Sequence, residues 1–288
     1  MTVQAVKHRG SVMDDQAPPL LTLLPVQGLA REVVLQTHSP ERDLVARKLH
    51  HEKQWEPFET RLWLASQEPG DVVVDVGANL GYYSILSALH DGSAQQIFAF
   101  EPAQDNVALL THNLVLNHCE SLVTVVPVAL SDRDSSAVLY RSDDNQGDHQ
   151  IYAGDGPRTH EAISLRHGGD FLGAAVDRID LLKVDTQGSE HAVINGLLPL
   201  LRRSAGHLRI LIELTPYSLR LAGSSGRALI TSLAELGLPF WIVDHLEHRL
   251  VASDAQALSE WADNVDSAAG DRGFMNIFVG YAPHDLCP

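Results

Sequence analysis

Short apolar runs, many of them rich in Val, Ile and Leu, recur from residue 71 onward and are separated by longer amphipathic stretches. Apolar runs of this length predict buried strands, and the longer stretches predict helices. We expect seven strands, at 72–76, 96–100, 122–126 with a continuation at 128–130, 179–184, 208–212, 240–243 and 274–279. Helices are expected at about 80–90, from 102 to about 117, after 188, at 216–221 and at 225–236. This alternation predicts an α/β fold, a mostly parallel seven-stranded sheet with helices on both faces.

The residues before this alternation predict an N-terminal extension that combines a hairpin and helices. Two short apolar runs on either side of Gly28 predict a hairpin over 20–36. Ser39-Pro40-Glu41 has the cap, the proline and the acid of a helix start, and a second helix is expected to begin near Pro57.

We therefore divide the chain into an N-terminal extension or cap at residues 1–68 and a larger domain at 69–282. Within the domain, residues 131–176 form an insert between the third and fourth strands. Two strands are expected in this insert, at 138–140 and 150–152, with a polar loop between them.

Charge and composition restrict the function classes. The net charge of -16 and the absence of a basic stripe argue against a nucleic-acid partner. No run approaches the ~20 apolar residues of a membrane span, and residues 1–10 lack an apolar signal core. Cys119 and Cys287 lie far apart, so no disulfide or cysteine metal site is expected. We expect a cytoplasmic protein that acts on a small molecule, without a nucleic-acid or membrane partner, and leave a homodimer open.

The segment 72–84 combines a buried strand, a glycine turn and the start of a helix. Asp75 lies near the end of the strand, and Gly77, Asn79 and Gly81 form the turn. Glycines permit a sharp turn and a close approach of the backbone to a ligand, and the first amides of a helix point outward as donors. The segment therefore predicts a nucleotide-type binding site.

Acidic residues follow the ends of several predicted strands, at Asp75, Glu101, Asp132, Asp185 and Glu213. Ligands of open α/β sheets bind outside these carboxyl ends. Glu101 follows Gly81 by 20 residues, a spacing that suits a carboxylate accepting hydrogen bonds from a ribose diol.

Nicotinamide enzymes and S-adenosylmethionine-dependent methyltransferases share this arrangement. Asn79 stands where a G-x-G-x-x-G fingerprint has its second glycine, which disfavours a pyrophosphate. Asp75 would repel phosphates but attract the ammonium and sulfonium of S-adenosylmethionine. These two residues favour S-adenosylmethionine as the cofactor, with S-adenosylhomocysteine as its product.

Four segments resemble, in order and spacing, the motifs of the FkbM family of class I S-adenosylmethionine-dependent methyltransferases. They are Val74-Asp75-Val76-Gly77-Ala78-Asn79-Leu80-Gly81-Tyr82-Tyr83-Ser84, Phe98-Ala99-Phe100-Glu101-Pro102, Val128-Ala129-Leu130-Ser131-Asp132, and Ile179-Asp180-Leu181-Leu182-Lys183-Val184-Asp185-Thr186-Gln187-Gly188-Ser189-Glu190. The likeness covers about residues 55 to 280 and implies a Rossmann-like class I methyltransferase fold. In place of the family's frequent Glu-Gly, this chain has Gln187-Gly188.

The resemblance also implies roles for individual residues in binding the cofactor. The turn at Gly77, Asn79 and Gly81 should hold the methionine part, with Asp75 near its ammonium. Glu101, followed by Pro102, should bind the ribose.

Further positions follow from the same resemblance. Asp132 and the backbone at Ser131 should lie beside the adenine. Asp185 should face the sulfonium and the acceptor, and Glu56 and Thr60 should lie on a helix over the cofactor.

A hydroxyl acceptor must lose a proton, so a general base is expected near the methyl group. His149 is the first candidate because it lies in the polar loop of the insert, where Asp148 or Asp144 could raise its basicity. His191, beside Glu190, is the second.

Other charged residues have structural explanations. Lys183 lies within a buried strand and predicts an internal ion pair with Asp185 or Glu213. Glu190 is expected either to cap the following helix or to bind the acceptor. No metal is expected, because His50 and His51 are adjacent and point to different faces of a helix.

The sequence therefore predicts in-line methyl transfer from S-adenosylmethionine to a hydroxyl of a small molecule, and the resemblance points to a sugar or a secondary metabolite. N-methylation remains an alternative, because the motifs bind the cofactor and not the acceptor. An NAD(P)-dependent oxidoreductase on the same type of sheet and a non-catalytic binding module also remain open.

Overall fold

The computed structural model describes residues 20–91, 94–142, 145–153, 158–204 and 206–286. The segment 1–10, Asp144 and Cys287, on which some expectations rest, lie outside the described residues. In the described part of the chain, no helix is both long enough and apolar enough to cross a membrane.

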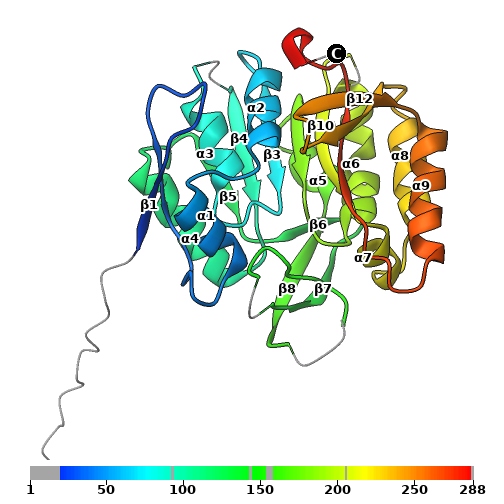
Figure 1. Ribbon diagram of the computed structural model, residues 1–288, viewed down its shortest axis with the longest axis horizontal. Helices are drawn as coiled ribbons and strands as arrows, with labels where there is room; N and C mark the ends of the chain where they lie inside the picture. The colour runs from blue at the N-terminus through cyan, green and yellow to red at the C-terminus, as the bar shows by residue number, and fades with distance from the viewer. Residues whose placement is uncertain (1–19, 92–93, 143–144, 154–157, 205, 287–288) are drawn as a thin grey trace, which may run out of the picture.

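The core of the protein is an eight-stranded sheet with the order β12-β11-β13-β10-β9-β3-β4-β5 (Figure 1). The strands β10, β9, β3, β4 and β5 are parallel, and β13 pairs antiparallel with both β10 and β11. Their bounds are β3 Val72–Val76, β4 Gln96–Phe100, β5 Val123–Val126, β9 Leu181–Val184, β10 Arg209–Leu214, β11 Phe240–Asp244, β12 Arg249–Ser253 and β13 Met275–Val279. The expected mostly parallel α/β sheet is confirmed.

The eighth strand, β12, was missed by the sequence analysis. It pairs antiparallel with β11 alone, at the edge of the sheet. Leu250 is its only fully buried residue, and Arg249, Val251 and Ala252 are exposed. An edge strand buried at one position gives little apolar signal.

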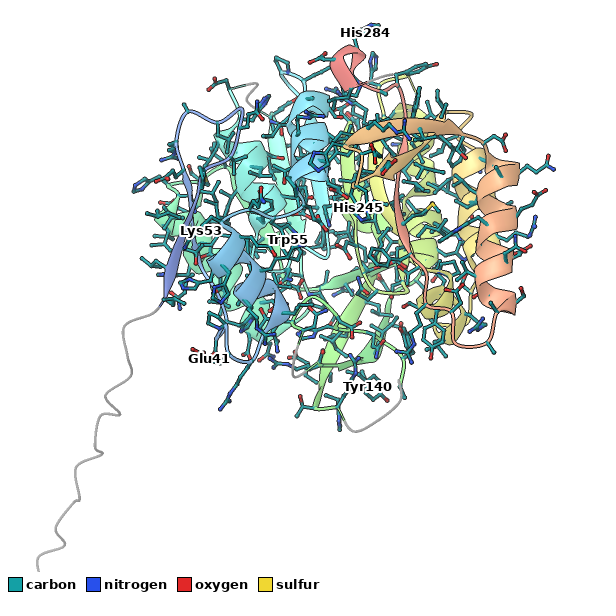
Figure 2. All side chains as sticks on the ribbon, in the orientation of Figure 1. Glu41, Lys53, Trp55, Tyr140, His245 and His284 are labelled. Carbon is teal, nitrogen blue, oxygen red and sulfur yellow. The ribbon has the colours of Figure 1, made fainter. Side chains whose placement is uncertain are left out.

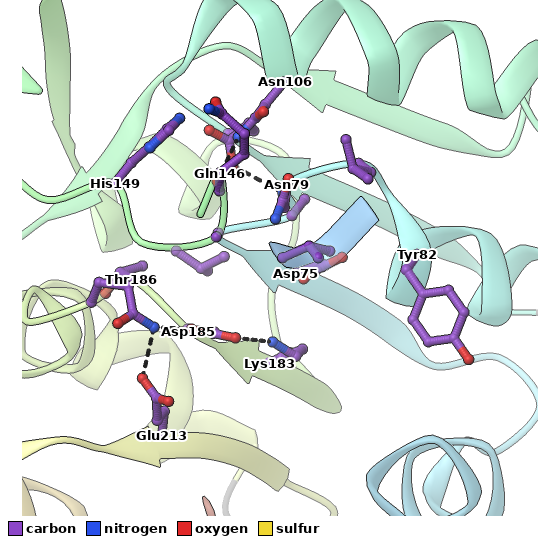
Figure 3. Close-up of a pocket in the computed structure, with 18 of the residues that line it drawn as sticks. Asp75, Asn79, Tyr82, Asn106, Gln146, His149, Lys183, Asp185, Thr186 and Glu213 are labelled. Atoms are coloured by element: carbon purple, nitrogen blue, oxygen red, sulfur yellow. Dashed lines mark hydrogen bonds and ion pairs between the residues drawn. The ribbon is translucent and has the colours of Figure 1, made fainter. Parts of the chain in front are cut away.

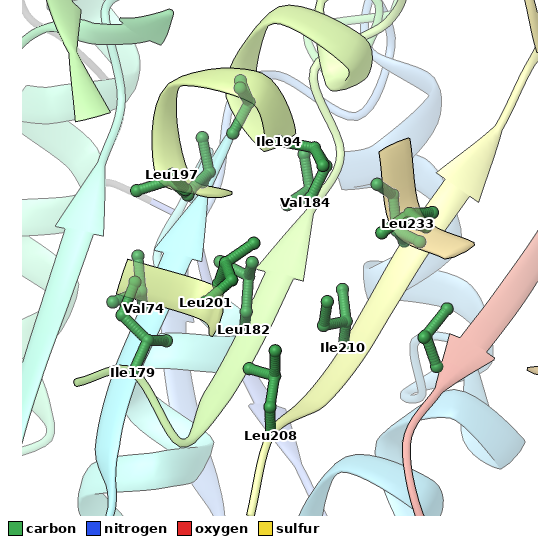
Figure 4. Packing of buried hydrophobic residues seen from close by; sticks show 14 of the residues in the cluster. Val74, Ile179, Leu182, Val184, Ile194, Leu197, Leu201, Leu208, Ile210 and Leu233 are labelled. Atoms are coloured by element: carbon green, nitrogen blue, oxygen red, sulfur yellow. The ribbon is translucent and has the colours of Figure 1, made fainter. Parts of the chain in front are cut away.

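Helices cover both faces of the sheet because alternate strand residues point to opposite sides. Val74 packs on one face with α5 (Gly168–Gly173), α6 (Glu190–Ser204), α7 (Pro216–Leu221), α8 (Gly226–Ala234) and α9 (Ala255–Ser267), as Figure 4 shows in part. Val73 packs on the other face with α1 (Leu44–Glu52), α2 (Pro57–Ser66), α3 (Tyr82–Leu89) and α4 (Gln104–Leu116). The N-terminal extension therefore shares a hydrophobic cluster with the main sheet.

The expected N-terminal hairpin is confirmed as β1 (Leu21–Leu24) and β2 (Val33–Gln36), which pair antiparallel. The start of the first helix was predicted wrongly. Residues 39–42 form a turn, and α1 begins at Leu44, where Asp43 accepts a hydrogen bond of 2.7 Å from the amide of Ala46. A side-chain acceptor at this position satisfies a free amide of the first turn. The start of α2 at Pro57 is as expected.

Two buried asparagines, Asn113 on α4 and Asn117 at its C-cap, attach β2 to the domain. The amide of Gln36 donates to Asn113 Oδ1 over 2.7 Å, and Asn113 Nδ2 donates back to the carbonyl of Gln36 over 3.0 Å. Asn117 makes the same pair of bonds with Val34, at 2.9 and 2.7 Å. Residues four apart lie on one helix face, so the two amides satisfy alternate residues of β2 as a neighbouring strand would.

The insert folds into a three-stranded sheet that lies beyond the end of the main sheet in Figure 1. It contains β6 (Ala129–Ser131), β8 (His160–His167) and β7 (Ser135–Tyr140) in that order. The strand expected at 150–152 is absent, and Gln150 forms only an isolated bridge with Tyr140. The partner of β7 is β8, whose alternating exposed residues hid it from the apolar pattern.

The third strand of the main sheet also ends earlier than expected. Residues 129–131 belong to the insert sheet and do not continue β5. Pro127 lacks an amide donor, so the ladder ends there. Figure 2 shows Tyr140 in the insert sheet and Trp55 and Lys53 in the N-terminal extension.

Candidate active site

A cavity of about 550 Å³ lies outside the carboxyl ends of the central parallel strands. Its walls come from the turn after β3, the ends of β4, β9 and β10, the N-terminal extension and the insert (Figure 3). This is the position at which open α/β sheets bind ligands, and the size suits a small molecule.

The glycine turn forms the floor of the cavity. Gly77 has φ +83°, and a Cβ atom there would lie 1.9 Å from the carbonyl oxygen of Asp185, so only glycine fits. Asn79 adopts a left-handed conformation with φ 49°. Gly77 and Asn79 line the cavity. Gly81 does not; it is the N-cap of α3.

Glu101 is held rigidly at the end of β4. Its two carboxylate oxygens accept the amides of Asn79 and Ala103, each over 2.9 Å. Burial raises the pKa of Glu101 to about 7, against the hydrogen bonds that favour the charge. Glu101 and Pro102 both line the cavity.

Asp75 is buried below the turn and lines the same cavity. Ser84 donates a hydrogen bond of 2.8 Å to Oδ2, whereas Oδ1 finds no partner among the described residues. Burial raises the pKa of Asp75. A buried carboxylate oxygen without a partner is costly, so this position favours a ligand that brings a donor or a positive charge.

Lys183 lies among the carboxylates of this part of the cavity. Its Nζ pairs with Asp185 Oδ2 at 2.9 Å, which confirms the expected internal ion pair. Burial opposes the charge, but Asp185, Glu56 and Asp75 together outweigh it and raise the pKa of Lys183. The lysine therefore remains charged and fixes the direction of the Asp185 carboxylate.

Gln187 links two acidic side chains. Its Nε2 donates to Asp185 Oδ1 over 2.9 Å and to Glu213 Oε2 over 2.8 Å (Figure 3). Burial and the nearby carboxylates of Asp185 and Glu190 raise the pKa of Glu213 well above its usual range. The amide at 187 supplies donors where a third carboxylate would repel the other two.

Glu56 and Thr60 were expected to lie over the cofactor, and of these two only Glu56 lines the cavity. Glu56 lines the cavity and accepts a hydrogen bond of 2.6 Å from the Tyr83 hydroxyl; desolvation raises its pKa. Thr60 does not line the cavity, because its hydroxyl bonds to the Trp55 carbonyl and to Tyr82.

Glu190, the first residue of α6, fixes the turn that leads into this helix. Its carboxylate accepts the amides of Thr186 and Gly188, each over 2.9 Å. Both amides belong to the turn before α6 and not to the first turn of the helix, so these bonds do not test the expected helix cap. Glu190 is not among the residues that line the cavity.

His149 lines the cavity, but its environment differs from the one expected of a base. Asp148 pairs with Arg158 at 2.8 Å and does not raise the basicity of the histidine. Burial, with Arg141, His38 and Arg158, lowers the pKa of His149 to about 4. Nδ1 accepts the amide of Ser142 over 3.2 Å, so the neutral ring carries its proton on Nε2. A ring in this state is a hydrogen-bond donor to the cavity and not a proton acceptor.

His191 is not placed at the site. Its Nε2 bonds to Asn195 and its Nδ1 to Ser224, at 3.0 and 2.5 Å, and it does not line the cavity. Burial lowers its pKa.

Ser131 and Asp132 are not among the residues that line the cavity, although Ala129 and Leu130 just before them are. At the end of β6 the Ser131 carbonyl packs against α6, where a Cβ on Gly196 would lie 2.0 Å from it. The Asp132 side chain is directed outward and pairs with Arg133. Both residues follow the cavity wall directly, at the point where the chain enters the insert sheet.

Several lining residues carried no sequence signal for the site. Gln146 and Asn106 contact each other across two segments, and Leu139 and Ile151 form an apolar wall. Their positions depend on how the insert packs on the domain. In the described part of the chain, no group of three or more His, Cys, Asp or Glu side chains is arranged to hold a metal ion.

The strand order and the glycine turn after β3 define a Rossmann-like, class I methyltransferase fold. A sequence model of the methyltransferase FkbM domain matches residues 75–237, which is more than half of the chain. The chain belongs to this family.

Curated relatives share part of the chain. Methyltransferase 1 from Beauveria bassiana (strain ARSEF 2860) is 29% identical over 145 residues, which are 43% of this chain and 57% of that protein. Methyltransferase sdnD from Sordaria araneosa is 26% identical over 164 residues, 46% of this chain and 63% of that protein. The chain thus matches about three fifths of the length of these relatives.

Solved structures show a more distant similarity. Methyltransferase FkbM from Methylobacillus flagellatus KT has a TM-score of 0.42 at 15% identity, with 73% of this chain and 43% of that chain covered. Precorrin-6y C5,15-methyltransferase from Geobacter metallireducens GS-15 has a TM-score of 0.43 at 14% identity, with coverages of 79% and 87%.

Proposed function

We propose that this protein transfers a methyl group from S-adenosylmethionine to a hydroxyl of a small molecule, a sugar or a secondary metabolite. The observation that carries the proposal is that three features line the same cavity. They are the glycine turn at Gly77, the unpartnered oxygen of Asp75 and the fixed carboxylate of Glu101.

These features fit S-adenosylmethionine. The unpartnered Oδ1 of Asp75 suits the ammonium of its methionine part, and the turn at Gly77 lines the same cavity. A carboxylate has about four acceptor positions. The amides of Asn79 and Ala103 and the Asn106 side chain use three of them, so Glu101 can still accept a hydrogen bond from a ribose hydroxyl.

When bound, S-adenosylmethionine supplies a methyl carbon on a sulfonium leaving group. The protein must then align the acceptor and exclude water. Lys183 and Gln187 hold the Asp185 carboxylate in one direction, so it can orient the acceptor hydroxyl. Glu213 lines the cavity beside it, and its carboxylate, when ionised, can accept the acceptor's proton.

The acceptor contacts come from elements outside the central sheet. Leu44, Lys48 and Trp55 of the N-terminal extension line the cavity, as do Arg272 and Phe274 before β13. We propose that the extension at residues 1–68 and the insert within the domain at 69–282 together select the acceptor.

An amine acceptor is the second candidate. Glu56, Asp185 and Glu213 surround the same part of the cavity, and carboxylates there would attract an ammonium group.

The test uses S-adenosylmethionine labelled with ¹³C in the methyl group and small-molecule extract from a strain that lacks the gene. Wild-type protein should label a product that the Glu101→Ala variant does not. The ¹³C chemical shift of the transferred methyl separates an O-methyl from an N-methyl product. Absence of any labelled product with the wild type would contradict methyl transfer to a small molecule.

A further inference from the structure

Part of the insert is fixed over the start of α4, beside Glu101. Arg141 pairs with Asp105 at 2.5 Å, and Asn106 donates to the Gln146 carbonyl over 3.4 Å. From the other side, the amide of Gln146 donates to Asp43 Oδ1 over 2.8 Å. These contacts place residues 145–149 at the end of the cavity away from Lys183, Asp185 and Glu213 (Figure 3).

The backbone of one residue, Ser142, orients two side chains of this segment. Its amide donates to His149 Nδ1 over 3.2 Å, and its carbonyl accepts Gln146 Nε2 over 2.9 Å. The first bond leaves the ring proton on His149 Nε2, and the second leaves Gln146 Oε1 as an acceptor.

Both outer atoms are buried without a hydrogen-bond partner in the described part of the protein. Both residues line the cavity. A buried donor and a buried acceptor without partners both lower the stability of a folded protein, so such pairs are unusual unless a ligand supplies the missing hydrogen bonds. Here both groups are fixed by the same residue, Ser142.

The neighbouring surface is apolar. Leu139 and Ile151 line the cavity and pack with Ala103, which follows Glu101 and Pro102. A flat heterocycle attached to a ribose at Glu101 would therefore lie against aliphatic side chains, with polar groups at its edge.

We propose that Gln146 and His149 bind the edge of the adenine of S-adenosylmethionine, an inference that rests on the proposed function. Gln146 Oε1 accepts from the exocyclic amino group, and His149 Nε2–H donates to the ring nitrogen N1. Gln146 and His149 thus have the adenine-binding role that the resemblance implied for Ser131 and Asp132, two residues that do not line the cavity. His149 is then a binding residue and not the general base.

The experiment is a calorimetric titration of the wild-type protein with S-adenosylhomocysteine and with S-inosylhomocysteine. Hypoxanthine replaces the amino donor with a carbonyl and the N1 acceptor with an N–H, which reverses the edge. Wild type should bind the adenine compound about 20-fold more tightly, or more, because two hydrogen bonds are replaced by mismatched pairs.

The variants Gln146→Met and His149→Phe should each weaken S-adenosylhomocysteine binding by about tenfold and reduce the preference for adenine to about threefold or less. Gln256→Met on α9 and His112→Phe on the exposed face of α4 are matched controls, and neither residue lines the cavity. Thermal unfolding of each variant shows whether it is folded.

Equal binding of the two compounds by wild type would overturn the inference, even if His149→Phe failed to fold. A His149→Phe variant with the affinity and the adenine preference of the wild type would also overturn it. If that variant had lost turnover as well, His149 would again be a candidate for the general base. Failure of wild type to bind S-adenosylhomocysteine at all would instead refute the proposed function, and with it this inference.

Discussion

The carboxyl of Glu101 should make cofactor binding depend on pH. It is 5% exposed and its pKa lies near 7 without a ligand, because burial disfavours the charge. Ribose hydroxyls donate to the ionised form, so binding must select that form. Affinity should therefore rise with pH up to about 7 and then level off.

The magnitude follows from the pKa. Below pH 7, each pH unit should weaken S-adenosylhomocysteine binding about tenfold, or about 1.4 kcal/mol, since the ionised fraction falls tenfold. At pH 6 the dissociation constant should thus be about ten times its value at pH 8. The unliganded protein should change in the opposite direction. A pKa raised from 4.5 to about 7 stabilises the fold at low pH by about 3 kcal/mol, and this stability is lost as pH rises through 7.

The assay is titration calorimetry of wild type and Glu101→Gln between pH 5.5 and 8. The variant should bind more weakly at high pH and should lose this pH dependence, so the difference between the two proteins isolates Glu101 from other titrating groups. Proton release near pH 7, measured in buffers of different ionisation enthalpy, should be present only in the wild type. A wild-type affinity that does not change with pH, or an identical dependence in both proteins, would refute the ribose assignment.

Three further substitutions test how the site is held. Gly77→Ala would place a Cβ 1.9 Å from the Asp185 carbonyl oxygen, so urea denaturation should show that the free energy of unfolding falls by more than about 3 kcal/mol. Gly70→Ala, also at positive φ but in open space, should lower it by only about 1 kcal/mol, and equal losses would contradict the close approach. Lys183→Met leaves buried carboxylates without their cation, so the free energy of unfolding should fall by about 3–5 kcal/mol at pH 7.5 but by less at pH 5.5, where the carboxyls take up protons. A loss of stability independent of pH would show that the charge is not the cause. Asn113→Leu removes the acceptor of the Gln36 amide, so hydrogen exchange at this amide should accelerate while amides of β3 stay protected, and unchanged exchange would exclude the asparagine as the attachment of β2.

The central sheet and the floor of the site were predictable because their signals are local. Val72–Val76 is apolar at every position except Asp75, and the turn after it requires glycine at Gly77 for a reason that the structure makes explicit. The acid at Glu101 follows at the spacing that the β-α-β connection sets. In such segments the residue types alone indicate that the strand is buried on both faces and that the backbone turns after it.

The rest depends on contacts between distant segments. Asp132 follows an apolar run as the other acids do, but packing of Ser131 against Gly196 directs the chain into the insert. The proton position on His149 depends on the backbone of Ser142, seven residues away. β8 was missed because half of its residues are exposed, and the expected partner of β7 was placed in a loop. No local pattern encodes these choices.

Fluorescence titration of Trp55 tests the central claim, cofactor identity, most directly, because this tryptophan lines the cavity beside Glu56. Wild-type protein should show saturable quenching by S-adenosylhomocysteine with one site per chain, competition by S-adenosylmethionine and no response to NADH. The Trp55→Phe variant should lose the signal but retain binding by calorimetry. Saturable binding of NADH, or no binding of S-adenosylhomocysteine by either method, would contradict the assignment of this cavity to a methyl donor.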